Sequence, residues 1–248
     1  MRVIREHPVG ALLLLGVSAA AWLFLAWLAT DMETPLAQLV MPMSPEWSAS
    51  TVLAVWSMWS VMMVAMMLPS ALPMIVTFVQ VAQRNRQPAR AHAFVAAYVL
   101  VWLAFAAACT AGQWTLQRYG ALDAMALRSS AAATVVLLIV AGLYQFSPLK
   151  RVCLASCRTP LAFLLGEWRP GVRGAFRMGV RHGQLCLGCC WALMALLFVG
   201  GAMNVPWVAA LAVAVAIEKL APFGDRIGGV LGVGLIGAGV IRWALIGI

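Results

Sequence analysis

Seven long apolar stretches divide this 248-residue chain, and a helix needs only about 20 apolar residues to cross a bilayer. They cover residues 10–29, 51–82, 93–111, 130–146, 185–203, 205–221 and 227–248. Only 10% of the residues are charged, whereas soluble domains carry about 25%. The sequence therefore predicts an all-α polytopic transmembrane helix bundle, a single membrane domain surrounded by lipid, and excludes a water-soluble enzyme.

Charged residues in the loops predict the orientation of this bundle. The segment 30–50 holds three acidic residues and no Lys or Arg, whereas the basic loop 147–184 holds seven Lys or Arg and one acidic residue. Lys and Arg collect in short cytoplasmic loops. We therefore predict that the N-terminus, with Arg2 and Arg5, is cytoplasmic and that the C-terminus lies outside. This placement accounts for the net charge of +9 without a nucleic-acid partner.

The stretch 51–82 is too long for a simple crossing. As a straight helix it would extend roughly 50 Å, against a hydrocarbon core of about 30 Å. We expect it to tilt, protrude or break at Pro69 and Pro73, because each proline frees the carbonyl four residues earlier. The carbonyls of Ala65 and Pro69 then need partners from protein or a cavity, since lipid offers none. This predicts a functional site near the two prolines.

Six methionines lie in the same stretch, between residues 58 and 74. Met58, Met62 and Met66 share one helix face at intervals of four residues. Met63 and Met67 form the neighbouring row. Thioethers are soft ligands that suit Cu(I), but methionine is also an adaptable packing residue. The pattern indicates either a copper-binding row or a core.

A second sulfur-rich segment begins the stretch 185–203. On a helix that starts by His182, the side chains of His182, Cys186, Cys190 and Met194 share one face, with Cys189 beside it. Three thiols and a thioether in this pattern are typical of a site for a thiophilic metal. Free cysteine is also a common small buried residue, so packing is the alternative interpretation.

Two further cysteines, Cys153 and Cys157, lie four residues apart in the basic loop. If this loop is cytoplasmic, its thiols stay reduced. Tetrahedral zinc sites take four Cys or His ligands, and Cys153, Cys157, Cys186 and Cys189 could supply them, with His182 in reserve. A structural zinc in a subunit or assembly factor of a larger membrane complex is therefore the alternative to copper.

Glu218 is the one carboxylate inside a predicted span, and it precedes Lys219. Ionisable groups within the membrane are functional candidates. The alternative interpretation is that Lys219 extends to the cytoplasmic surface and simply pairs with Glu218.

The last stretch is rich in glycine. Gly228 and Gly232 have the spacing that lets two membrane helices approach closely. We expect this face to pack inside the bundle, with a homo-oligomer contact as the alternative.

Several motifs, in order, resemble a bacterial family of predicted metal-binding integral membrane proteins, domain of unknown function 2182, whose members are copper-chaperone-like. They are the methionine run 62–74, the segment 144–158, the cysteine run 186–194, residues 201–204 and Glu218-Lys219. The resemblance implies a multi-pass protein of the bacterial cytoplasmic (inner) membrane. The motif positions are Met62, Met63, Met66, Met67, Met74, Cys153, Cys157, Cys186, Cys189, Cys190, Met194 and Glu218.

From these patterns we predict a membrane protein that binds Cu(I) and relays or delivers it to a metallochaperone or membrane-complex partner. An enzyme is disfavoured, because the sequence offers neither a nucleophile–base pair nor paired carboxylates in a span. The predicted metal ligands are Cys186, Cys189, Cys190, Met194, Met62, Met66, Met63, Met67, Cys153, Cys157 and His182.

Overall fold

The computed structural model describes residues 8–31, 33–123 and 127–246, and it confirms the predicted all-α bundle. A pair of two-residue antiparallel strands joins α5 to α6. The elements are α2 (Pro8–Thr30), α3 (Pro35–Val40), α4 (Ala49–Arg84), α5 (Pro88–Arg118), β1 (Leu122–Asp123), β2 (Arg128–Ser129), α6 (Ala131–Gln145), α7 (Pro148–Arg158), α8 (Pro160–Glu167), α9 (Gly171–Ala195), α10 (Leu197–Gly200), α11 (Val205–Leu220) and α12 (Gly224–Ile246).

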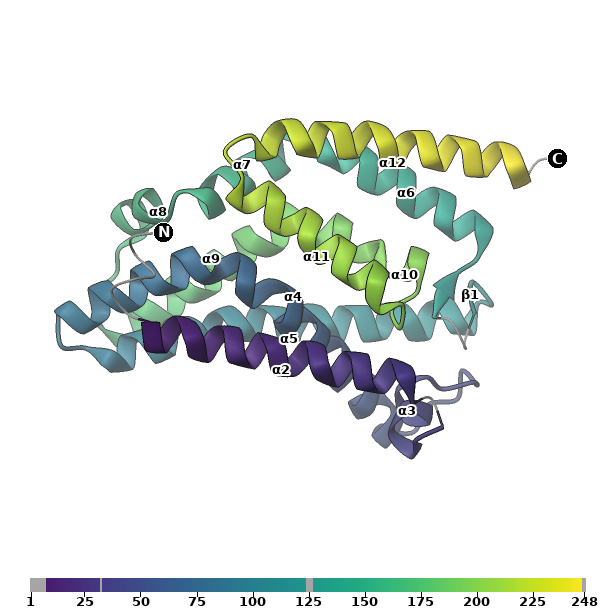
Figure 1. The fold of residues 1–248 in the computed structure, drawn as a ribbon, viewed down its shortest axis with the longest axis horizontal. Helices are drawn as coiled ribbons and strands as arrows, with labels where there is room; N and C mark the ends of the chain where they lie inside the picture. Colours follow the sequence, from purple (N-terminus) through teal and green to yellow (C-terminus); the bar gives the residue numbers. More distant parts are fainter. Residues whose placement is uncertain (1–7, 32, 124–126, 247–248) are drawn as a thin grey trace.

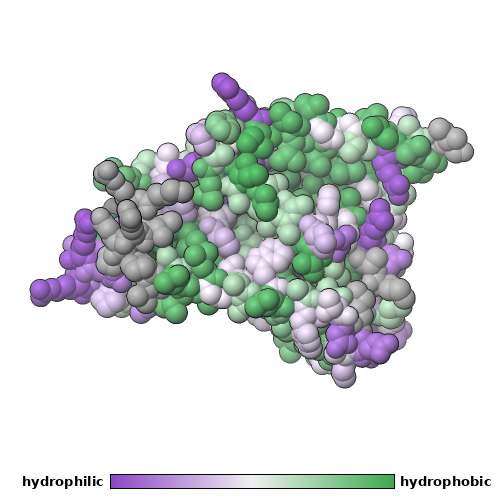
Figure 2. Space-filling view, viewed as in Figure 1, coloured by the Kyte–Doolittle hydropathy of each residue, from purple (hydrophilic) through white to green (hydrophobic). Residues whose placement is uncertain are grey.

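Among the described residues, five helical segments are long and apolar enough to cross a membrane: α2, α4, α5, α9 with α10, and α12. A sixth is gained if α6 and α7, which meet at 64°, together form one bent span. The remaining predicted stretch, 205–221, is helical as α11, but its 16 residues make it shorter than each of the five spans named above. Hydrophobic residues cover the middle of the visible face, and hydrophilic residues gather towards its ends (Figure 2). Seven crossings stay a prediction.

The long helices run between two ends of the molecule (Figure 1). The α4–α5 turn, α8 and the α11–α12 turn lie towards one end, and α3 and β1 lie towards the other. Loops predicted for the same side of the membrane therefore share an end. Arg2 and Arg5, on which the orientation partly rests, lie outside the described residues. Which end faces the cytoplasm stays a prediction.

The central helix α4 does not break at its prolines, in contrast to one of the outcomes we predicted: Pro69 and Pro73 both lie inside one helix. The expected new partners are present for one of the two freed carbonyls, that of Ala65. The carbonyl of Ala65 accepts hydrogen bonds from Ser18 Oγ at 2.8 Å and Trp22 Nε1 at 3.1 Å, both on α2. These side chains replace the N–H that Pro69 lacks, so the Ala65 carbonyl stays paired within the helix.

The helix α9 begins at Gly171, well before the boundary predicted near residue 185. Arg173, Arg177 and Arg181 made this segment resemble a loop. They are four residues apart and exposed, so they share the outer face of the helix. The opposite face is buried and includes Gly174 and Gly179. The four-residue spacing of the arginines was the sequence signal for this longer helix.

Gly179 brings α9 close to α5. A Cβ atom at this position would meet the backbone carbonyl of Phe94 and would lie 2.8 Å from Ala97 Cβ. We therefore expect Gly179→Ala to lower the free energy of unfolding by about 1–3 kcal/mol, since backbone cannot move aside as a flexible side chain can. Thermal unfolding in detergent measures this. Gly166→Ala in α8, where a Cβ meets nothing within 4 Å, is the control; equal losses in both variants would contradict the assignment of a close helix contact.

The glycine-rich helix α12 packs on α6. Cβ atoms at Gly232 and Gly239 would lie 2.7 Å from Phe146 and 2.8 Å from Ile139, respectively. This small-residue face therefore serves packing inside the chain, as expected. The homo-oligomer alternative stays a prediction.

Candidate metal site

The sulfur atoms of α4 and α9 meet in the middle of the bundle. Met67 of α4 and Cys186 and Cys190 of α9 form what we call the sulfur site. The Cys190 thiol lies 4.0 Å from the Met67 sulfur, and none of the three side chains is more than 1% exposed. Met67 lies near the middle of α4, and Cys186 and Cys190 lie in the second half of α9.

The thiols of α9 are held by their own helix. The thiols of Cys189 and Cys190 both donate hydrogen bonds to the carbonyl oxygen of Cys186, each at 3.0 Å. His182, Cys186, Cys190 and Met194 lie on one continuous helix and are buried, as the four-residue spacing predicted. The thiol of Cys186 is left to face α5 and α11.

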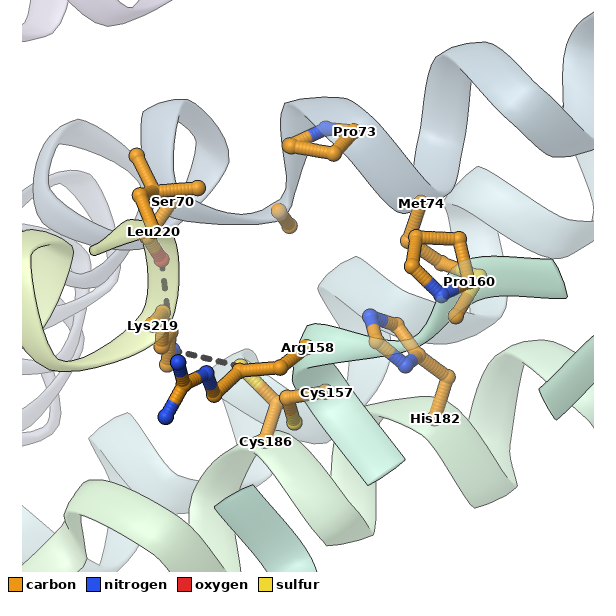
Figure 3. Close-up of a pocket in the computed structure, with 11 residues that line it drawn as sticks. Ser70, Pro73, Met74, Cys157, Arg158, Pro160, His182, Cys186, Lys219 and Leu220 are labelled. Carbon is orange, nitrogen blue, oxygen red and sulfur yellow. Dashed lines mark hydrogen bonds between the residues drawn. The ribbon is translucent and has the colours of Figure 1, made fainter. Parts of the chain in front are cut away.

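A lysine side chain lies against these sulfurs. The Nζ atom of Lys219 is 3.0 Å from Cys186 Sγ, 3.8 Å from Met67 Sδ and 3.2 Å from Ser70 Oγ. Figure 3 shows Lys219 directed at Ser70 and Cys186. The Lys219 residue is only 6% exposed, so the site already accommodates a cation in contact with a thiol and a thioether.

Tyr98 of α5 joins the two sulfur-bearing helices. Its hydroxyl group lies 3.2 Å from Cys186 Sγ and 3.3 Å from the Met67 carbonyl oxygen. Tyr98 also stacks on the His182 ring at 5.5 Å between centroids. Within the described residues, neither ring nitrogen of His182 has a hydrogen-bond partner. Tyr98 therefore orients Cys186, while His182 is a buried donor or acceptor close to it.

A cavity of about 200 Å³ adjoins the sulfur site. Cys157 of α7 lies in its wall with Met74 and His182, and Figure 3 shows these side chains around the same space as Cys186 and Lys219. Arg158 also lines the cavity. The structure thus places one predicted loop cysteine beside the sulfur site.

The other candidate ligands lie elsewhere in the core. Met62 lines a separate small cavity with Trp22 and Met203, and Cys153 packs against Gly188, where a Cβ would lie 2.7 Å from its sulfur. Further candidates are buried, but no described contact joins them to the sulfur site: Met58, Met63, Met66 and Met194.

Glu218 does not pair with Lys219, which corrects that interpretation. Its Oε2 atom accepts from Lys150 Nζ of α7 at 2.6 Å, and both side chains are buried. Adjacent residues of a helix point about 100° apart. Glu218 therefore reaches α7, while Lys219 reaches the sulfur site and not the surface.

The donors that meet in the sulfur site are sulfur atoms. In the part of the chain that the structure describes, no group of three or more His, Cys, Asp or Glu side chains is arranged to hold a metal ion. Zinc binding by Cys153, Cys157, Cys186 and Cys189 stays a prediction. The thiol and thioether groups of Cys186, Cys190 and Met67 are soft donors of the kind that bind thiophilic metals.

Three residues of this site did not emerge from the sequence: Ser70, Tyr98 and Lys219 as a neighbour of sulfur. Lys219 carried the clearest signal. Adjacent residues of a helix point about 100° apart, so Lys219 and the intramembrane Glu218 face different neighbours. Nothing in the sequence distinguishes Tyr98 or Ser70 from other core residues.

A comparison with protein families matches residues 56–242 to the model of a family described as copper chaperone, PpoB2. The matched range contains every residue of the sulfur site and its surroundings. No curated protein and no solved structure matches the chain.

Proposed function

The chain belongs to the PpoB2 family of copper chaperones, and we propose that it carries Cu(I) within the membrane on the sulfur site between α4 and α9. Met67, Cys186 and Cys190 are the ligands. The protein is a carrier and not an enzyme, and it resides in the cytoplasmic membrane of a bacterium. Copper is its cargo.

One observation carries this proposal: a cation already lies against the sulfurs. The Nζ atom of Lys219 contacts both Cys186 Sγ and Met67 Sδ. A buried positive charge is costly unless its surroundings compensate it, so this pocket is built to hold one. The donors that meet there are sulfur atoms, which favour Cu(I) over zinc or a hard cation.

The adjoining cavity offers a route by ligand exchange. Cys157, in the wall of the cavity beside Cys186, would receive Cu(I) from the end of the bundle where α7 meets α8. Transfer to Cys186 and Met67 then exchanges one sulfur ligand for another, with no change in oxidation state. Delivery runs back through the same cavity to a metallochaperone or a membrane complex.

Met67→Leu tests the proposal against Met62→Leu as a matched control. Both methionines lie buried on α4, but only Met67 belongs to the sulfur site. We expect the wild type to bind Cu(I) stoichiometrically under reducing conditions. Met67→Leu should weaken binding at least about tenfold, the loss that even outer-shell changes cause at metal sites.

Competition with a Cu(I) chelator measures the affinities, and mass spectrometry measures metal content. Met62→Leu should bind Cu(I) as the wild type does. Zinc or no metal in the wild type would contradict the proposal, as would equal losses in the two variants.

A further inference from the structure

We propose that Lys219 is a built-in competitor for copper: its ammonium group occupies the Cu(I) position in the metal-free protein and must leave when copper binds. This inference rests on the proposed function and adds how the site loads and releases its cargo. The contacts of Lys219, the space beside it and the anchoring of its helix each support this inference.

The Lys219 ammonium group and a bound Cu(I) ion would occupy the same position. Nζ is 3.0 Å from Cys186 Sγ and 3.8 Å from Met67 Sδ, so it caps the two ligands on their shared side. A metal–thiolate bond is shorter still, about 2.3 Å for zinc. A metal bonded to both sulfurs would therefore overlap the ammonium group, and the two positive charges would repel one another strongly in a buried site.

The Lys219 side chain has room to move away from the sulfur site. Lys219 lines the cavity of about 200 Å³ beside the sulfur site. Its backbone is held in place, because the neighbouring Glu218 is paired with Lys150 at 2.6 Å. Displacement therefore requires new side-chain torsions of Lys219 and no movement of α11 as a whole.

Lys219 is expected to return to the sulfurs when Cu(I) leaves. Arg158 lines the same cavity, and its guanidinium group is held by the carbonyl oxygens of Ala221 and Pro222, each at 2.7 Å. The Arg158 guanidinium group is itself paired with Asp225 at 3.3 Å, and the described lining of the cavity holds no carboxylate that could pair with a displaced ammonium group. The loss of its sulfur contacts is therefore what drives Lys219 back. Lys219 then lowers the affinity for Cu(I) and speeds its release, as a carrier requires.

Replacing Lys219 by glutamine tests this inference by the sign of the effect. If Lys219 competes with copper, Lys219→Gln removes the competitor, and the Kd for Cu(I) should fall about tenfold or more, in proportion to how fully the lysine fills the site. Release of Cu(I) to an excess of chelator should slow to a similar degree. If Lys219 instead supports Cys186 as a ligand, the same variant should bind Cu(I) more weakly, which overturns the inference.

Arg158→Gln is the matched control, because it removes one positive charge from the same cavity without touching the described sulfur site. It should leave the Kd within about twofold of the wild type, as expected for a charge that is not displaced by the metal. A Kd lowered as far as in Lys219→Gln would show a general charge effect and overturn the inference.

A second measurement needs no variant. Amine labelling of the wild type, read by mass spectrometry with and without Ag(I) as a redox-inert substitute for Cu(I), should show Lys219 labelled several-fold faster once the metal is bound. Lys150, paired with Glu218, is the internal reference and should stay protected. Unchanged labelling of Lys219 in metal-loaded protein overturns this inference alone, whereas a wild type that binds neither metal overturns the proposed function as well.

Discussion

Lys150→Met is expected to lower the free energy of unfolding by about 3–5 kcal/mol, since it leaves the carboxylate of Glu218 buried without its partner. The exposed fractions of the two side chains are 3% and 2%, and their charged atoms are 2.6 Å apart. This ion pair also links α7 to α11, because Lys150 lies on α7 and Glu218 lies on α11. The loss is measured by unfolding in detergent with increasing denaturant.

The double variant Lys150→Met/Glu218→Gln distinguishes lost pairing from lost packing. When both charges are removed, most of the stability should return, because no uncompensated charge remains in the core. A double variant as unstable as Lys150→Met would contradict this account and assign the loss to packing around the lysine stem. The cycle of single and double variants gives the coupling energy of the pair.

The sequence was sufficient to predict the faces of individual helices. The four-residue spacing from His182 to Met194 predicted one buried face, and the structure places all four positions on it. Pro69 predicted an orphaned carbonyl at Ala65, and the structure shows its two new donors. Both inferences use only the geometry of one helix.

Contacts between helices could not be predicted from the sequence, because hydrophobic periodicity does not say which helices are neighbours. Six methionines of α4 looked equivalent, yet only the packing of α4 against α9 and α11 singles out Met67. For the same reason a surface position of Lys219 stayed open as an alternative. Charge also misled at Arg173 and Arg177, where an exposed helix face was mistaken for a loop.

Cys186→Ser is expected to cause the largest loss of copper binding, about 100-fold or more in Kd, the upper range of losses at metal sites. Cys186 Sγ is the sulfur that touches both Lys219 and Tyr98, so it lies at the centre of the site. A serine hydroxyl fills nearly the same space but is a hard oxygen donor that does not suit Cu(I). Chelator competition under anaerobic, reducing conditions measures the change.

Cys109→Ser on α5 is the control, because Cys109 is a buried thiol with no described contact to the sulfur site. Cys109→Ser should keep the wild-type Kd for Cu(I). A comparable loss of affinity in this variant would mean that serine weakens copper binding by disturbing the fold. If Cys186→Ser binds Cu(I) normally, the ligands must be other thiols, such as Cys157 across the cavity. Because Lys219 loses its sulfur partner in Cys186→Ser, faster amine labelling of Lys219 without metal would show that the thiol is what holds the lysine in the site.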